Sequence, residues 1–339
     1  MFWAFPRQKK TRSVFRSQSF LVSFQKTRPK KDFHYRPNAG LPSKKIVTKR
    51  IKMNIKKQIS LAYLIFLNIC VFAQNDSINF ATAKNIILKI DKNTILKKIV
   101  FNNSNLYNAN QNISILEIKR PKSYQFRIAF NQKNLETTST LALNNRAVAA
   151  INGNFFDTKR GGSVDFLKVN NQIVCKNQLS NGFRNFHQKA AIVIKKGKIF
   201  IEKYNHFNDW EMRLSANNIM VSGPLLVFNN NLEYIDESAF NKNRHPRSVL
   251  AITKSNHVLM ITIDGRHANA AGMSLHEVQK ILSWLEVKSA INLDGGGSTT
   301  LFVAGQLPNG IVNYPCDNKT WDHFGERNVA NIIFLTKKN

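Results

Sequence analysis

The chain has 339 residues, a formal net charge of +30 and a hydrophobic fraction of 43%. This length accommodates one large domain or two small ones. A charge of this size is common in nucleic-acid-binding proteins, but no basic-aromatic module of a nucleic-acid-binding fold is present, so we expect no nucleic-acid partner.

Much of the positive charge lies at the N-terminus. Residues 1–52 hold 15 Lys and Arg against a single Asp, a net charge of +14, and show no sustained hydrophobic periodicity. We expect translation to start at Met53, which makes residues 1–52 a mis-annotated stretch or a basic N-terminal extension.

Residues 53–73 have the three parts of a secretory signal peptide. A charged start is followed by an apolar run at 59–72, and Val71-Phe72-Ala73 forms a small-residue cleavage site before Gln74. The apolar run is short for a membrane span, so we expect no stable membrane insertion after cleavage. The predicted location is periplasmic or extracellular. A lipoprotein anchored through Cys70 is the alternative, which the bulky Ile69 disfavours.

The chain from residue 74 onward keeps 33 Lys and Arg against 19 Asp and Glu, again a net charge of +14. This balance favours an anionic substrate or an anionic envelope surface. Two cysteines remain, Cys175 and Cys316, and their spacing leaves open whether they pair in an oxidising compartment. The oligomeric state is also open.

Residues 74–93 are expected to form a loosely patterned lead-in segment, and residues 94–336 one domain without a linker. Short apolar or alternating runs predict strands, and a short helix is expected at 136–145. The predicted strands are 95–101, 113–118, 124–130, 147–151, 164–169, 190–194, 198–201, 248–253, 257–263 and 329–335, and the apolar stretch 219–228 is broken by Gly223-Pro224.

The clearest predicted helix covers residues 274–287. Ser274 and Glu277 form a capping box, and apolar residues then recur at helical spacing. Many short strands with few helices predict an α+β fold with a mixed, mostly antiparallel β-sheet core.

The stretch 290–303 predicts a strand, a glycine turn and a second strand. Asp294 ends the first strand, and Gly295, Gly296 and Gly297 follow it. Glycines let the backbone approach a ligand closely, and successive N–H groups in such a turn can bind an anion. The hydroxyl groups of Ser298 and Thr299 add donors. A simple turn is the alternative, whereas a nucleotide P-loop is disfavoured because no Gly-Lys-Ser/Thr follows.

Other predicted strands also end in polar loops, where a scaffold commonly displays functional groups. Arg247, Arg266 and Arg327 occupy such loops, and guanidinium groups suit phosphate oxygens. Surface salt bridging is the alternative for any one of them.

Three carboxylates, Asp264, Asp294 and Glu326, also lie in these loops beside Gly or Arg. Glycoside cleavage requires a pair of carboxyl groups, and the sequence does not give their separation. Asp264 and Asp294 are equally compatible with turn residues that cap nearby backbone.

We expect no metal and no cofactor. The histidines lack His-Glu-x-x-His spacing, and the cysteines lack paired spacing. A serine nucleophile elbow is also missing, because Ser298 is followed by two threonines.

Several motifs together resemble the phosphodiester glycosidase family, which includes the catalytic domain of the mannose-6-phosphate uncovering enzyme. The similarity covers about residues 94–336. Asn154 stands where relatives often have glycine or a small residue, and the segment around Cys316 is variable. The matching motifs are Ala150-Ile151-Asn152-Gly153-Asn154-Phe155-Phe156-Asp157, Ser222-Gly223-Pro224, His245-Pro246-Arg247-Ser248, Asp264-Gly265-Arg266, Asn292-Leu293-Asp294-Gly295-Gly296-Gly297-Ser298-Thr299-Thr300 and Gly325-Glu326-Arg327-Asn328-Val329-Ala330-Asn331.

The resemblance implies hydrolysis of the glycosidic bond in a sugar-1-phosphodiester, such as a GlcNAc-1-phosphodiester in envelope or dietary glycans. Our hypothesis assigns acid/base or nucleophile roles to Asp294 and Glu326, with Asp264 as the third candidate. The expected substrate-binding residues are Asn152, Arg247, Arg266, Gly295, Gly296, Gly297, Ser298, Thr299 and Arg327. Two alternatives are a non-catalytic module that binds anionic glycans and a phosphodiesterase that cleaves the P–O bond.

Overall fold

The computed structural model describes residues 75–131, 134–306 and 308–338. The predicted extension at 1–52 and signal peptide at 53–73 lie outside the described residues. Within the described ranges, no helix has both the length and the apolar character needed to span a membrane.

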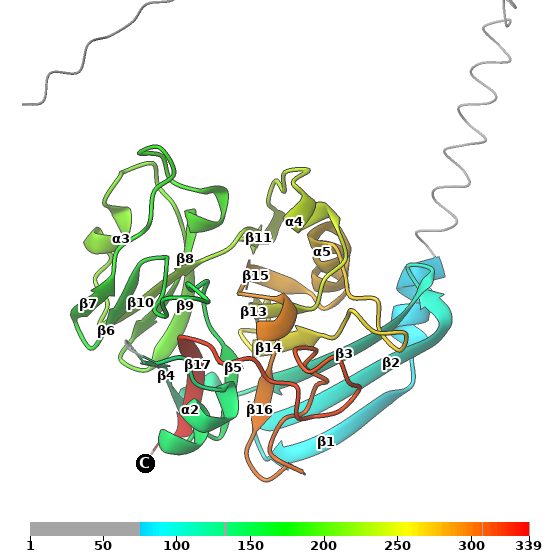
Figure 1. Ribbon diagram of the computed structural model, residues 1–339. Coiled ribbons are helices and arrows are strands. Elements are labelled where there is room, and N and C mark those ends of the chain that lie inside the picture. Colours follow the sequence, from blue (N-terminus) through cyan, green and yellow to red (C-terminus); the bar gives the residue numbers. More distant parts are fainter. Residues whose placement is uncertain (1–74, 132–133, 307, 339) are drawn as a thin grey trace, which may run out of the picture. The chain divides into compact units, whose positions relative to one another are not determined.

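The described chain forms three antiparallel sheets (Figure 1). The large sheet has eight strands, in the order β1-β2-β3-β14-β13-β15-β11-β12. Its strands are β1 (Asn85–Asp91), β2 (Thr94–Leu106), β3 (Ala109–Ile118), β11 (Leu225–Phe228), β12 (Asn231–Leu232), β13 (Arg247–Thr253), β14 (Val258–Ile263) and β15 (Val287–Asn292).

The second sheet has five strands, in the order β7-β6-β10-β8-β9, and the third has four, in the order β16-β5-β17-β4. The second sheet contains β6 (Leu167–Val169), β7 (Gln172–Cys175), β8 (Ala190–Lys195), β9 (Lys198–Lys203) and β10 (Asn218–Ser222). The third contains β4 (Tyr124–Phe130), β5 (Ala149–Asn152), β16 (Leu301–Val303) and β17 (Asn331–Lys337).

The central core is built from one face of each of the three sheets. Side chains alternate between the faces of a strand, so each strand of the large sheet serves two cores. On β13, Leu250 points into the central core, whereas Val249 and Ala251 join the cluster on the opposite face. These long apolar strands therefore lie buried on both sides.

Helices cover the outer faces of the sheets. Helix α5 (Leu275–Trp284) buries Leu275, Val278, Ile281 and Leu282 against the large sheet. Its predicted capping box is confirmed, because Ser274 Oγ accepts from Glu277 N and the Glu277 carboxylate accepts from Ser274 N. Helix α2 (Thr138–Asn144) packs against the third sheet. The other short helices are α3 (Trp210–Arg213), α4 (Ala239–Lys242), η1 (Pro121–Ser123), η2 (Phe186–Gln188) and η3 (Gly296–Ser298).

The predicted α+β class with mostly antiparallel sheets is confirmed. The apolar stretch 219–228 forms two strands in different sheets, β10 and β11, separated by Gly223-Pro224. Residues 75–82 are helical, and β1 is an edge strand that pairs with β2, so the expected lead-in segment joins the large sheet. The exposed residues of β1 lack clean alternation, which is why the sequence pattern did not reveal it.

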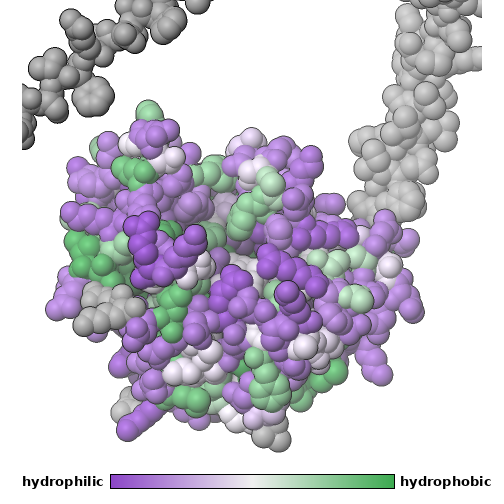
Figure 2. Space-filling view, in the orientation of Figure 1, coloured by the Kyte–Doolittle hydropathy of each residue, from purple (hydrophilic) through white to green (hydrophobic). Residues whose placement is uncertain are grey.

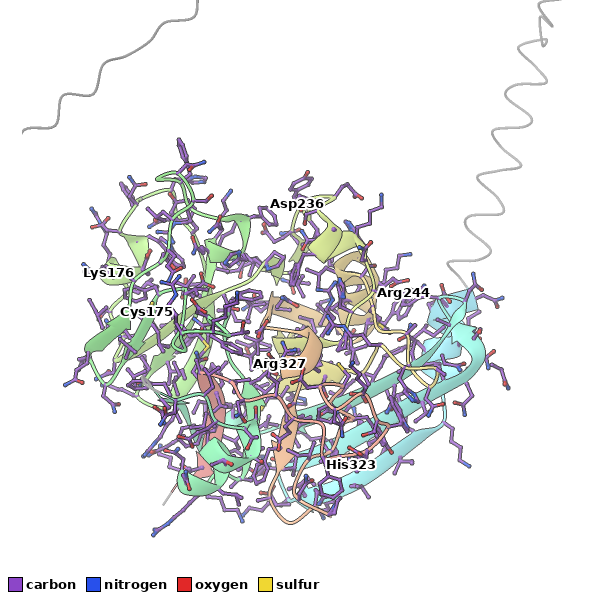
Figure 3. All side chains as sticks on the ribbon, viewed as in Figure 1. Cys175, Lys176, Asp236, Arg244, His323 and Arg327 are labelled. Atoms are coloured by element: carbon purple, nitrogen blue, oxygen red, sulfur yellow. The ribbon has the colours of Figure 1, made fainter. Side chains whose placement is uncertain are left out.

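Cys175 and Cys316 are both free thiols, so the pairing that the sequence left open is not formed. Figure 3 shows Cys175 near the strands of the second sheet, apart from the labelled Arg327. In Figure 2, hydrophilic side chains cover much of the displayed face, and hydrophobic side chains form smaller patches, one of them over β7.

Strand direction places the polar loops together. Arg247 at the start of β13 pairs with Ile263 at the end of β14, and Val249 pairs with Asn292 at the end of β15. The loops that contain Arg247, Asp264 and Asp294 therefore leave the large sheet at the same end.

Candidate active site

Asp294 lies at the centre of the converging loops. Its backbone N–H donates to Gly153 O over 3.0 Å, and its Oδ1 accepts from Gly295 N over 2.9 Å. The side chain is only partly accessible to solvent. Burial raises the pKa of Asp294 to about 6, against the opposing effects of Ser298, Gly295 N–H and the positive charge of Arg327.

Asn152 is a buried residue whose side chain bonds to the loop that contains Asp294. Its Nδ2 donates to Asp294 O over 2.6 Å, while its Oδ1 accepts from Ser248 Oγ over 2.6 Å and from Thr300 N over 3.2 Å. The side chain is fully buried. Asn152 therefore orients the loop that contains Asp294, and its amide has no contact with the solvent from which a substrate arrives.

The glycine turn differs from the expected amide cradle. Gly295 N donates to Asp294 Oδ1, and Gly296 N donates to Pro246 O over 2.9 Å. Ser298 N and Thr299 N donate to oxygens within the turn. These four N–H groups, of Gly295, Gly296, Ser298 and Thr299, already have protein acceptors, so they are not directed at an anion. Ser298 and Thr299 are buried.

The glycines instead make room for two guanidinium groups. A Cβ at Gly296, whose φ is +63°, would lie 2.9 Å from Arg266 Nη2. A Cβ at Gly297 would lie 2.5 Å from Arg327 Nη2. Any side chain at these positions would thus displace an arginine, so the turn provides the surface against which Arg266 and Arg327 rest.

The two arginines are held differently. Arg327 Nε and Nη2 donate to Asp317 Oδ1 over 3.0 and 2.5 Å, which fixes its guanidinium plane. Arg266 is exposed and has a left-handed backbone with φ +62°. Residues other than glycine rarely adopt this conformation because of their Cβ, and such strain is often found at functional sites. Figure 3 shows Arg327 near the middle of the fold.

Arg247, a predicted substrate-binding residue, and Asp264, a predicted catalytic candidate, both lie inside the protein, away from solvent. Arg247 is 0% exposed and donates to the carbonyl oxygens of Met273, Phe240 and Asn243. Asp264 is 1% exposed and accepts from Asn313 Nδ2 and Tyr314 N, both at Oδ1. Because neither side chain reaches solvent, both act as supports for the loops above them.

Burial also perturbs the ionisation of these two groups. It raises the pKa of Asp264 to about 7, although the donors Asn313, Tyr314 and Asn112 favour the carboxylate. It lowers the pKa of Arg247 to about 10, with help from the positive charge of Arg266. His245, partly exposed in the same loop, has a pKa lowered by burial and by both arginines.

Glu326 lies in an adjoining part of the site. Its carboxylate accepts from Ser139 N over 3.0 Å and from Ser139 Oγ over 2.5 Å, at the start of α2. Burial raises its pKa against these two bonds. Glu326 also lines a groove of about 600 Å³ together with Phe156, Asp317 and Arg327. Arg327 is therefore close to both predicted carboxylates. It follows Glu326 in the chain and lines the same groove, and its positive charge acts on Asp294.

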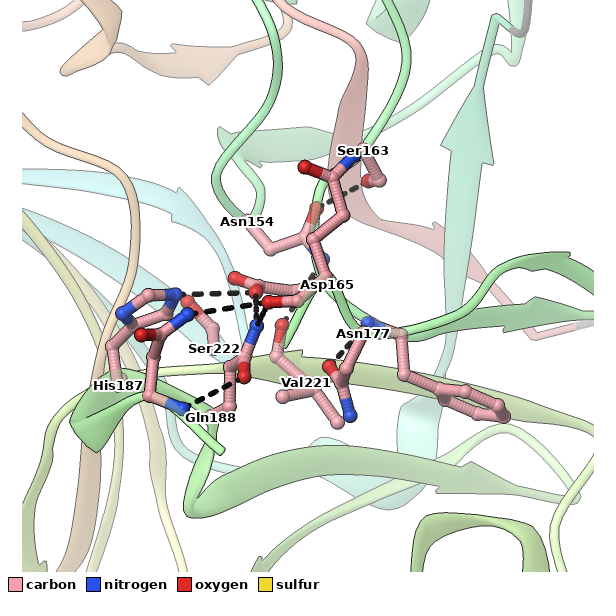
Figure 4. Close-up of polar contacts among 12 residues, drawn as sticks. Asn154, Ser163, Asp165, Asn177, His187, Gln188, Val221 and Ser222 are labelled. Carbon is pink, nitrogen blue, oxygen red and sulfur yellow. Dashed lines mark hydrogen bonds and ion pairs between the residues drawn. The ribbon is translucent and has the colours of Figure 1, made fainter. Parts of the chain in front are cut away.

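A carboxylate–histidine pair that no sequence motif revealed acts electrostatically on Asp294. Asp165 is 0% exposed, and its Oδ1 lies 3.1 Å from His187 Nε2 and accepts from Gln188 Nε2 over 2.7 Å (Figure 4). After burial, the negative charge of Asp165 also raises the pKa of Asp294. The available signal was a lone Asp within the apolar run 164–167.

His187 is the member of this pair that is accessible to solvent. Its side chain is 30% exposed, and the edge of its ring contacts Phe155 with centroids 4.9 Å apart. Asp165 Oδ2 has no hydrogen-bond partner within the part of the chain that the structure describes. An imidazole held by a buried carboxylate is well placed to accept or donate a proton.

The site thus has acidic groups beside cationic ones. Arg266 and Arg327 lie against the glycine turn that follows Asp294, and the charges of Arg327 and Asp165 both act on the Asp294 carboxylate. Such a site can bind an anionic group and present a carboxylate to the atom bonded to it. Among the described residues, no group of three or more His, Cys, Asp and Glu side chains is arranged to hold a metal ion.

Comparison with solved structures shows the same fold elsewhere. The catalytic domain of zebrafish N-acetylglucosamine-1-phosphodiester alpha-N-acetylglucosaminidase, auto-inhibited by its pro-peptide, matches with a TM-score of 0.56 and 19% identity, over 76% of this chain and 89% of that chain. A hypothetical protein from Synechocystis matches with a TM-score of 0.52 and 16% identity, over 76% of this chain and 64% of that chain.

Sequence comparison adds one distant relative and a family. The SPbeta prophage-derived uncharacterized protein YomE of Bacillus subtilis (strain 168) is 24% identical over 186 residues, which are 54% of this chain and 28% of that protein. The chain therefore spans less than a third of that relative's length. The phosphodiester glycosidase family model matches residues 145–336, more than half of the chain. The resemblance predicted from the motifs is confirmed, and this chain belongs to the phosphodiester glycosidase family.

Proposed function

We propose that this protein is an exported enzyme that hydrolyses the glycosidic bond of a sugar-1-phosphodiester, of the GlcNAc-1-phosphodiester kind. The observation that supports it most directly is the position of Asp294, beside the glycine turn against which Arg266 and Arg327 rest and where the charges of Arg327 and Asp165 act on its carboxylate. Export, to the periplasm or the cell exterior, is supported by the pattern of residues 53–73.

In the proposed reaction, the C–O bond between the sugar and phosphate breaks. Ionised Asp294 attacks the anomeric carbon or activates the water that attacks it. Arg266 and Arg327 bind the phosphate and offset the charge that grows on its leaving oxygen. A phosphate monoester has a second pKa of about 6, so this leaving group depends on charge stabilisation more than on protonation.

The second carboxyl group of the proposed pair is Glu326, whose groove is shared with Arg327. Its role is to transfer a proton to or from the reacting oxygen atoms. The observed Asp165–His187 pair is a second candidate for this proton transfer, because its charge acts on Asp294 and it remains accessible through the imidazole. Asn152, Arg247 and Asp264 take positioning roles, as their burial requires.

Isotope labelling tests which bond breaks. We expect hydrolysis of a synthetic GlcNAc-1-phosphodiester or UDP-GlcNAc in ¹⁸O-water to place the label in the free sugar. Mass spectrometry of both products is the measurement, and the Asp294→Asn variant provides the blank. Label in the phosphate product would identify a P–O phosphodiesterase. Saturable binding without release of sugar would identify a non-catalytic glycan-binding protein.

The pH profile tests the electrostatic coupling within the site. Because Asp294 must be ionised and its pKa is raised to about 6, we expect kcat/KM to fall as the pH drops below about 6. Replacing Asp165 by Asn removes a negative charge that disfavours ionisation of Asp294. We therefore expect the acidic limb of the profile to move to lower pH in Asp165→Asn, measured from pH 4 to 9.

An Asp209→Asn variant serves as the control, because Asp209 is exposed and its carboxylate pairs with Arg213. It should retain the wild-type profile. An unchanged acidic limb in Asp165→Asn would show that Asp165 does not act on the group that controls this limb.

A further inference from the structure

A second groove lies at the opposite end of the strands that form the active site. It has a volume of about 800 Å³ and is bordered by Ile252 of β13, Val258 of β14 and Ser289 of β15. On β13, five residue steps of roughly 3.3 Å separate Arg247 from Ile252, which places the groove roughly 17 Å from the active-site end. This groove is therefore separate from the candidate active site.

The floor of the groove is apolar. Its side chains come from β9, β11, β13 and β14, and include Phe200, Phe228 and Ile252. Phe200 is 42% exposed, and Phe228 and Ile252 are partly buried against the central core. Apolar side chains that stay at least partly accessible within a concave surface are typical of a binding site for an apolar group.

The rim of the groove is cationic. Five basic residues line it, and no ion pair involves any of them in the described ranges. They are Lys119, Arg120, Lys122, Lys198 and Lys288. The carboxylate in the lining is Glu202, whose pKa is raised by burial.

The positive charge continues beyond this rim. A neighbouring groove of about 640 Å³ shares Lys122 and Ser123 with the first one. It adds Lys92, Lys337 and Lys338, together with Asp91. The local potential is therefore strongly positive around an apolar surface.

We propose that this groove, which we call the basic groove, binds one amphiphilic anion that has a single acyl or alkyl chain and a phosphate or carboxylate head. The chain would cover the apolar floor and leave water. The lysine ammonium groups are mobile point charges, which suits an anionic head without demanding one fixed geometry. A free anion has no apolar chain to bury on the floor of the groove. A neutral amphiphile has no charge to attract the lysine ammonium groups.

Calorimetric titration with dodecyl phosphate, below its micelle concentration, tests this site. We expect one molecule to bind per protein chain. Inorganic phosphate and the neutral amphiphile dodecyl maltoside should each bind at least tenfold more weakly. Equal binding of dodecyl phosphate and dodecyl maltoside, or uptake of many molecules per chain, would overturn the proposal.

Two variants locate the binding. Lys198→Glu/Lys288→Glu should weaken dodecyl phosphate binding at least tenfold, whereas the matched charge reversal Lys159→Glu/Lys176→Glu, at exposed lysines elsewhere, should not. Phe200→Ser should also weaken binding. Because Phe200 is 42% exposed, we expect this variant to fold. Thermal unfolding checks that each variant is folded. Binding that both groove variants leave unchanged would exclude this location.

Two further measurements separate the basic groove from other possibilities. Turnover of a soluble sugar-1-phosphodiester should be the same in wild type and Lys198→Glu/Lys288→Glu, because the groove lies away from Asp294. If Lys198→Glu/Lys288→Glu lost turnover together with dodecyl phosphate binding, the basic groove would not be separate from the active site. Binding to phosphatidylglycerol vesicles without binding to dodecyl phosphate would indicate a bilayer surface as the partner and would overturn the single-molecule site.

Discussion

Replacing Asp294 by Asn is expected to lower kcat by about a thousandfold, within the range of roughly 10² to 10⁴ that loss of an acid or base group produces. The amide is isosteric and keeps an oxygen that accepts from Gly295 N–H, but it neither attacks carbon nor removes a proton from water. Initial rates of sugar release from a synthetic sugar-1-phosphodiester provide the measurement.

The same variant is expected to remain folded at pH 8. Burial raises the pKa of folded Asp294 to about 6, from an ordinary value of 3.8. A raised carboxyl pKa means that the stability contribution of this group is complete below pH 4 and is lost as the pH rises through about 6. The neutral amide avoids that loss, so the thermal midpoint of Asp294→Asn at pH 8 should equal or exceed that of wild type.

Two outcomes would contradict this assignment. Near-wild-type turnover would remove Asp294 from the mechanism. A lower thermal midpoint together with lost activity would assign it a structural role instead. Asp209→Asn is again the control, because its exposed carboxylate should affect neither measurement.

Replacing Arg266 or Arg327 by Met is expected to lower kcat/KM by about a hundredfold in each case, the order of magnitude for loss of one electrostatic contact to a developing charge. Both guanidinium groups lie against the glycine turn beside Asp294. Lys at either position should recover part of the loss, because it restores the charge but not the planar fork. Steady-state kinetics with the same substrate test these changes.

Arg327→Met carries a second signature. Arg327 lowers the pKa of Asp294, so its loss should move the acidic limb of kcat/KM to higher pH, opposite to the shift in Asp165→Asn. Arg213→Met is the matched control, since Arg213 is exposed and pairs with Asp209. A loss of activity with no movement of the limb would place Arg327 outside contact with Asp294.

Local patterns in the sequence determined the sheet-rich class, helix α5 with its capping box, and the strand–turn–strand unit around Asp294. These features depend on neighbouring residues, through side-chain alternation, cap hydrogen bonds and glycine content. The family also followed from short contiguous motifs. The convergence of their loops was inferred from that family pattern, and the shared strand ends at Arg247, Asp264 and Asp294 account for it.

Only the tertiary structure decided which polar groups stay available. Gly295 and Gly296 give their N–H groups to Asp294 and Pro246, and Arg247 gives its guanidinium to three carbonyls from other segments. Asp165 and His187 belong to the second sheet and its loops, more than a hundred residues before Asp294. Hydrogen-bond partners and burial arise from packing between distant segments, so no local pattern of residues specifies them.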